Sequence, residues 1–162
     1  MLKYCGIVLV SGAISMYGAY LAGRLGKNRA LREALYELLI HIKTGIDYGA
    51  APLSDIFASF HNELLDSVGF TPILKDGSHD AFRKAIESEV IKLPNEISKL
   101  YESLAASLGK SGLSKVESEL VARYMSLIST EEDKLTKKEQ VKQVLYRRLG
   151  LLCGLFAALL LI

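Results

Sequence analysis

Apolar residues are concentrated at the two ends of the chain, and between the ends they recur at helical spacing. The first uncharged segment, Tyr4 to Gly23, has 20 residues. A helix rising about 1.5 Å per residue would therefore cover the ~30 Å hydrocarbon core of a bilayer. This length favours a transmembrane helix over residues 1–23 rather than a secretory signal peptide, which has a shorter apolar region and an A-x-A cleavage site.

The second apolar segment, residues 149–162, has only 14 residues. It supplies about 21 Å of helix, which is short for a membrane span. We expect it to span with help from Tyr146, from local thinning of the bilayer, or from snorkelling of Arg147 and Arg148.

The body between these segments, residues 24–148, shows the i, i+3, i+4, i+7 pattern of amphipathic helices. Asn28 is expected to cap a helix that ends near Gly49. Pro52 is expected in the first turn of a second helix, which Gly69 and Pro72 would end. The apolar positions expected on the buried faces of these two helices are Leu31, Ala34, Leu35, Leu38, Leu39, Ile42 and Ile46, then Leu53, Ile56, Phe57, Phe60, Leu64 and Val68.

Three further helices are predicted, and none of the sequence shows the alternation typical of strands. A third buries Ala81, Phe82, Ala85, Ile86 and Val90 and stops at Pro94, and a fourth begins at Asn95 and closes at Gly109. Ser114 and Glu117 form a capping box for the fifth. The fifth would bury Val116, Leu120, Tyr124, Leu127 and Ile128 and continue without a breaker into the second apolar segment. The prediction is an all-α protein: an antiparallel cytoplasmic bundle of five to six helices, flanked by transmembrane helices.

The charges indicate how the chain is oriented in the membrane. From Glu33 to Thr136 there are 17 acidic residues against 10 basic ones, whereas basic residues gather beside both apolar segments. Positive charge next to a membrane segment stays on the cytoplasmic side, so the body is expected in the cytoplasm and both termini outside. Lys3 alone opposes this orientation. The two basic collars are Arg24, Lys27, Arg29 and Arg32, and Lys137, Lys138, Lys142, Arg147 and Arg148.

Small residues recur at intervals of four in both apolar segments. Small side chains on one face allow two helix backbones to approach in lipid, although such residues are common in membrane helices in any case. The sequence leaves open whether these faces meet each other or those of another copy of the chain. The predicted packing residues are Ser11, Ser15, Ala19 and Gly23, and Gly150, Gly154 and Ala158.

The sequence offers no recognisable catalytic, cofactor or metal motif. The two cysteines, Cys5 and Cys153, both lie in the apolar ends, and the three histidines show no ligand spacing. The acidic body lacks the basic face that nucleic-acid binding requires. We therefore expect no catalytic residue, no cofactor, no metal and no nucleic-acid partner, and take the basic collars as contacts to membrane lipid.

Three stretches resemble the stage III sporulation protein AB family, in the right order and over nearly the whole chain. Leu31 to Leu53 (LREALYELLIHIKTGIDYGAAPL) is similar to its leucine-rich helix followed by an I-x-Y-G-x-x-P-L element, and Leu104 to Gly112 (LAASLGKSG) to its leucine-glycine turn. Tyr146 to Ile162 (YRRLGLLCGLFAALLLI) is similar to its closing segment. The turn departs from the family pattern of aspartate followed by glutamine, since Ser111-Gly112-Leu113 and Glu117-Ser118 stand there.

The resemblance implies a helical bundle similar to the F-type platform domain of type II secretion and type IV pilus machines. It further implies a non-enzymatic scaffold subunit of the channel complex between mother cell and forespore. Such a protein would lie on the mother-cell side of the outer forespore membrane and dock a cytoplasmic secretion-type ATPase and other channel subunits.

The partner-facing element expected first is the connection formed by Tyr48, Gly49, Pro52 and Leu53. A plain turn between two helices is the competing interpretation of these residues. For the whole chain, the alternative is a membrane-anchored signalling or regulatory adaptor with no role in a secretion channel, and a membrane enzyme is the weaker third class.

Overall fold

Helices account for all the regular structure in the part of the chain that the computed structural model describes, namely residues 2–49, 51–76, 78, 80–110 and 114–161. The side chains of residues 2–11, 49, 157, 158, 160 and 161 lie outside the described part. The chain divides into two compact units. Unit 1 comprises Met1–Arg29 and Lys134–Ile162, and unit 2 comprises Ala30–Asp133.

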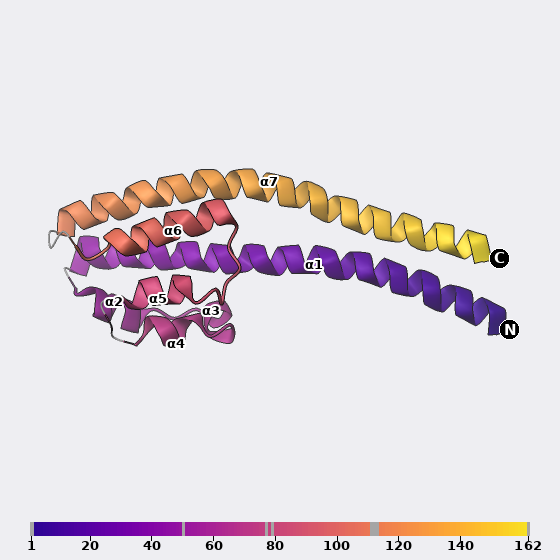
Figure 1. The fold of residues 1–162 in the computed structure, drawn as a ribbon, viewed down its shortest axis with the longest axis horizontal. Coiled ribbons are helices and arrows are strands. Elements are labelled where there is room, and N and C mark those ends of the chain that lie inside the picture. The colour runs from indigo at the N-terminus through magenta and orange to yellow at the C-terminus, as the bar shows by residue number, and fades with distance from the viewer. Residues whose placement is uncertain (1, 50, 77, 79, 111–113, 162) are drawn as a thin grey trace. The chain divides into compact units, whose positions relative to one another are not determined.

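Two long helices supply residues to both units (Figure 1). They are α1 (Leu2–Thr44), which continues as a π-helical turn η1 (Gly45–Gly49), and α7 (Ser114–Leu161). The shorter helices of unit 2 are α2 (Leu53–Ser59), α3 (Glu63–Ser67), α4 (Phe70–Leu74), α5 (Ala81–Glu87) and α6 (Asn95–Ser107). In unit 2, α4 packs against α3 and α5, and α5 packs against α6.

The predicted helix start at Asn28 is wrong, because α1 is continuous from Leu2 to Thr44. The segment between Gly23 and Leu31 contains no proline. Its glycine and asparagine each disfavour a helix by about 1 kcal/mol or less, whereas a break would require a second helix to be nucleated. The predicted single helix from Ser114 into the second apolar segment is confirmed by α7.

The core of unit 2 is built on one face of α1. All seven apolar positions predicted there, from Leu31 to Ile46, are buried. The face is buried against the short helices and α7, whose largest fully buried side chains include Phe70, Tyr101 and Ile128. On α7 the predicted Ile128 is buried, but Val116 and Leu127 are exposed and Val121 is buried instead.

The predicted second helix is broken into α2, α3 and α4. The break lies at Phe60, whose backbone is extended, and at Asn62, whose side-chain oxygen accepts hydrogen bonds from the amides of Leu64 (3.0 Å) and Leu65 (3.3 Å). This cap starts α3 in a new rotational phase, so Leu65 is fully buried and the predicted Leu64 is exposed.

Gly69 and Pro72 also act differently from the prediction. Gly69 adopts a left-handed conformation, φ 81°, and is the N-cap of α4. Pro72 then lies in the first turn of α4, where its missing N–H group leaves no helical hydrogen bond unmade. Pro94 is similarly the N-cap of α6, and Asn95 is its first residue.

A partly buried ion pair joins α1 to α7 inside unit 2. The Arg32 side chain is only 3% exposed, and its Nε donates to the Glu132 carboxylate at 3.0 Å. Arg32 was expected in the basic collar beside the membrane, but this contact places it in the body. Burial, with the charge of Glu132 adding to it, raises the pKa of the nearby Tyr101 hydroxyl, which therefore stays neutral.

Within the part of the chain whose side chains are described, none of the helices is sufficiently long and apolar to cross a bilayer. Residues 1–11 of the first predicted span lie outside that part.

Arg32→Ala should lower the free energy of unfolding by about 2 kcal/mol, because it leaves the Glu132 carboxylate without its buried guanidinium partner. Arg83→Ala is the matched control, since Arg83 pairs with Glu87 at 3.2 Å on the exposed side of α5. It should cost about 0.5 kcal/mol or less. Urea denaturation of the purified chain measures both. Equal losses for the two variants would contradict a structural role for the buried pair.

Candidate partner interface

The end of α1 changes from α-helix to π-helix over Gly45–Gly49. Such turns are rare and often occur at functional sites. A side chain at Gly45 would place its Cβ 2.7 Å from Cγ1 and Cδ1 of Ile56, which is 3% exposed. The missing side chain therefore allows Ile56 of α2 to pack directly on the π-helical turn.

His41 fastens α2 to the same end of α1. Its Nε2 lies 3.1 Å from the Ile56 carbonyl oxygen and 3.0 Å from the Ser59 hydroxyl, and its ring lies 5.4 Å from that of Phe60. Ser59 in turn donates to the Ile56 carbonyl at 2.9 Å. These contacts hold α2 against the end of α1.

Tyr48 lies on this connection with 89% of its surface exposed. Of the other predicted interface residues, Gly49 is the last residue of η1, and Pro52 is exposed and forms the N-cap of α2. Leu53 is half-buried. Tyr48 and Gly49 therefore end η1 and Pro52 and Leu53 begin α2, and the ring of Tyr48 is exposed to solvent instead of buried in the core.

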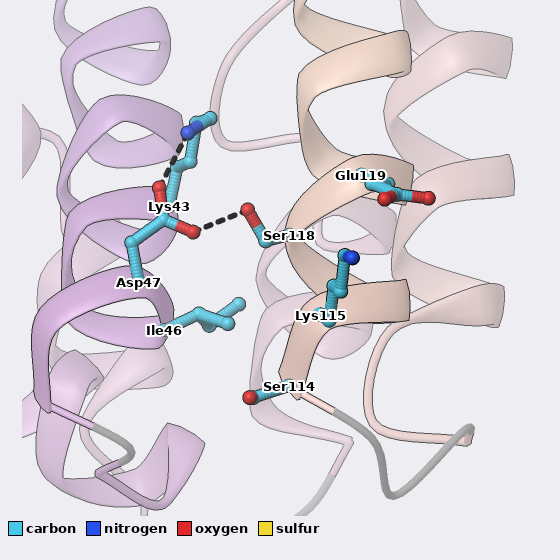
Figure 2. A pocket seen from close by; sticks show the side chains of 7 residues that line it. All are labelled: Lys43, Ile46, Asp47, Ser114, Lys115, Ser118 and Glu119. Carbon is cyan, nitrogen blue, oxygen red and sulfur yellow. Dashed lines mark hydrogen bonds and ion pairs between the residues drawn. The ribbon is translucent and has the colours of Figure 1, made fainter.

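A cleft of about 400 Å³ adjoins the turn, between the end of α1 and the start of α7 (Figure 2). At its centre, the ammonium of Lys43 donates to one carboxylate oxygen of Asp47, and the Ser118 hydroxyl donates to the other. Its lining combines two cations, two acids, two hydroxyls and one apolar side chain: Lys43, Ile46, Asp47, Ser114, Lys115, Ser118 and Glu119. These groups suit hydrogen bonds and salt bridges to a polar surface.

The hydrogen bond from Lys43, with a smaller contribution from Ser118, lowers the pKa of Asp47 below its usual value. The carboxylate is therefore ionised throughout the neutral range. Asp47 and Lys43 thus form an ion pair on the lining of the cleft, and Asp47 directly precedes Tyr48 in the chain.

Sequence reasoning missed Lys43, Asp47 and Ser118 as parts of this region. Two signals were available. Lys43 and Asp47 are spaced i, i+4, which places them on one side of a helix. Ser118 stands where the chain departs from the family's pattern, and the residue chosen there makes the contact to Asp47.

Some of the small residues in unit 1 lie where two helix backbones touch. A Cβ added to Gly18 would lie 2.9 Å from both the Gly150 Cα and the Tyr146 carbonyl oxygen. The Ser15 hydroxyl donates to the Gly150 carbonyl at 3.5 Å. The contact is made within one chain, between α1 and α7.

The predicted packing residues divide between this contact and the exposed surface. Ser15, Gly150 and the buried Gly154 belong to the contact side, whereas Ala19 and Gly23 are exposed, and a Cβ on Gly23 would meet nothing within 4 Å. The side chains of Ser11 and Ala158 lie outside the described residues. The contact face of α1 instead runs through Ser15, Gly18 and the fully buried Ala22, at the 3–4 spacing of a helix-pair seam.

The remaining surface of unit 1 exposes many large apolar side chains. On α1 they are Met16, Tyr17 and Tyr20, and on α7 they are Val141, Val144, Leu145, Tyr146, Leu149, Leu151, Leu152, Leu155, Phe156 and Leu159. Many exposed apolar side chains on one unit are typical of contact with lipid or with another protein.

Gly18→Ala should lower the thermal unfolding midpoint of the chain, because the added methyl group would overlap backbone atoms that cannot rotate away. Gly23→Ala is the matched control: the space around Gly23 is open, and alanine favours a helix over glycine by about 1 kcal/mol. Circular dichroism melting curves compare them. A Gly18→Ala midpoint at or above that of the parent would show that the two backbones do not depend on this approach.

Comparison with known proteins gives one family. The model of the family described as stage III sporulation protein AB matches residues 3–162. A search of the curated proteins and a search of the solved structures give no match. The chain therefore belongs to the stage III sporulation protein AB family, and the resemblance found in the sequence is confirmed.

Proposed function

We propose, starting from the membership of this chain in the stage III sporulation protein AB family, that it is a non-enzymatic membrane platform needed for spore formation. Unit 1 anchors the chain, and unit 2 is presented to the cytoplasm on the mother-cell side of the outer forespore membrane. There it docks a cytoplasmic secretion-type ATPase and other subunits of the channel between mother cell and forespore.

The exposure of Tyr48 is the observation that carries the docking part of the proposal. A tyrosine that is 89% exposed contributes little to the stability of its own chain, yet tyrosine is among the residues that most often dominate binding energy at protein interfaces. It belongs to a π-helical turn against which Ile56 packs, and His41 contacts the carbonyl oxygen of Ile56. A fixed backbone presenting one large ring favours binding, because little conformational entropy is lost.

The net negative charge of unit 2 favours a partner whose contact surface is basic. Unit 2 carries 17 acidic residues against 10 basic ones, and the ionised Asp47 lies next to Tyr48. Such a field would steer a partner bearing a positive patch toward the acidic unit. We therefore place the docking surface at Tyr48, Pro52 and the adjoining cleft.

The composition and surface of unit 1 support the anchor. Its sequence contains 10 basic residues and one acid, Glu139. The 20-residue uncharged stretch Tyr4–Gly23 is long enough for a bilayer, and the facing part of α7 exposes leucines from Leu149 to Leu159. Basic residues at the inner ends of both segments favour an orientation with the body in the cytoplasm.

An adaptor that signals from the membrane without joining a secretion channel is the second candidate, since the same anchor and exposed turn would serve it. Cross-linking in sporulating cells separates the two candidates. A platform would capture other channel components, and an adaptor would not.

Tyr48→Ala should weaken capture of the secretion-type ATPase at least about tenfold, which corresponds to the loss of a contact worth about 1.4 kcal/mol or more. Its thermal unfolding midpoint should stay near that of the parent, because the ring is exposed. Leu64→Ala is the control, since Leu64 is an exposed apolar residue of unit 2 on α3. If Tyr48→Ala leaves capture of the ATPase unchanged, the turn is not the docking site.

Orientation is tested by thiol labelling of intact cells. In a chain with Cys5 and Cys153 replaced, we expect Ser103→Cys on the exposed side of α6 to be protected from a membrane-impermeant maleimide until the cells are lysed. The same cysteine in a lysate is the control for reactivity. Labelling before lysis would place the body outside the cytoplasm and contradict the platform.

A further inference from the structure

The two helices of unit 1 form an antiparallel pair whose register is fixed by three contacts. Gly150 lies against Gly18, and its carbonyl accepts from Ser15. Further along, the Gln143 side-chain amide donates to the Ala22 carbonyl at 3.3 Å. Residue numbers rise on α1 as they fall on α7, which is the antiparallel arrangement (Figure 1).

This register places Arg147 and Arg148 beside the uncharged segment of α1. They lie between Gln143 and Gly150 on α7, so they are level with the stretch from Gly18 to Ala22 on α1. That stretch belongs to the uncharged segment, which ends at Gly23. With a rise of 1.5 Å per residue, the two arginines lie about 5 to 8 Å inside the end of the segment.

Neither arginine is neutralised within its own unit. Both are exposed, and neither forms an ion pair among the described residues. Glu139, the one acid in the sequence of unit 1, precedes them by two helical turns. Apolar side chains surround them along α7: Leu145 is 50% exposed and Leu149 is 46% exposed.

Uncompensated charges at such a depth are costly in a bilayer unless they meet an anion. A guanidinium group presents planar donors that match two phosphate oxygens, and an arginine side chain extends toward the headgroups when its backbone lies in the apolar region. The exposed rings of Tyr17, Tyr20 and Tyr146 lie at the same level, as aromatic residues do near the headgroup boundary.

We propose that Arg147 and Arg148 form a binding site for the phosphodiester group of an anionic phospholipid. A headgroup with net negative charge fits two adjacent cations, whereas an ammonium-bearing neutral headgroup would add a third cation beside them. The site rests on the proposed membrane anchorage of unit 1 and names the lipid class that the anchor selects.

The test uses the full chain reconstituted in phosphatidylcholine bilayers containing about a third phosphatidylglycerol. Spin-labelled phosphatidylglycerol and spin-labelled phosphatidylcholine report which lipid is held at the protein surface. The parent should prefer the anionic label, and the double variant R147Q/R148Q should lose at least about fivefold of that preference. The matched control K92Q/K99Q removes the same charge from exposed positions of unit 2 and should change the preference by less than about twofold.

Two added measurements distinguish the outcomes. Resistance to alkaline extraction reports insertion, so a parent that is inserted but shows no anionic preference would overturn the lipid site and leave the anchorage standing. Equal losses in both double variants would also overturn it. A parent that does not insert would defeat the anchorage and this site together. Inorganic phosphate at constant ionic strength should not displace the anionic label, and displacement would identify a site for free phosphate.

Discussion

The buried face of α1 from Leu31 to Ile46 is the constraint on which unit 2 depends. Two other elements of the unit are held to this helix by specific contacts. Arg32 near its start pairs with Glu132 of α7, and His41 near its end holds α2 through Ile56. The short helices α2 to α6 are too brief to be stable in isolation, because helices below about 15 residues are marginal in water. They persist because they bury side chains against this face.

Much of this arrangement follows from the sequence, because a strong helical period identifies the buried side without knowledge of the neighbours. That was true of α1 and of the unbroken α7. The helical period predicted the wrong buried side between Leu53 and Val68. It could not show that the Asn62 side chain caps a new helix there, which buries Leu65 in place of Leu64. A capped start and a continued helix differ little in free energy, so the packing of the whole unit determines which of them forms.

The candidate interface was predictable only in part, for a related reason. The turn at Tyr48 could be singled out, but its exposure depends on the π-helical turn, which inserts an extra residue and rotates the next side chains around the helix axis. The contact of Asp47 with Ser118 joins residues 71 positions apart and requires the fold itself. In unit 1, the four-residue interval pointed to Ala19 and Gly23, whereas two antiparallel helices meet along a 3–4 seam, which selects Gly18 and Ala22.

The segregation of charge between the units gives the proposed platform a physical basis. Unit 1 is strongly basic and unit 2 is acidic, and the dividing positions lie within α1 and α7. Along α7 the net charge changes from negative to positive, whereas α1 is basic in unit 1 and neutral in unit 2. An anionic lipid surface would attract the first unit and repel the second. Repulsion would keep the acidic unit from spreading on the lipid that the proposed anchor binds. The surface of the acidic unit, with the exposed Tyr48, would then stay available to the basic partner that we propose, and the preference of that partner for this unit would follow from the same charges.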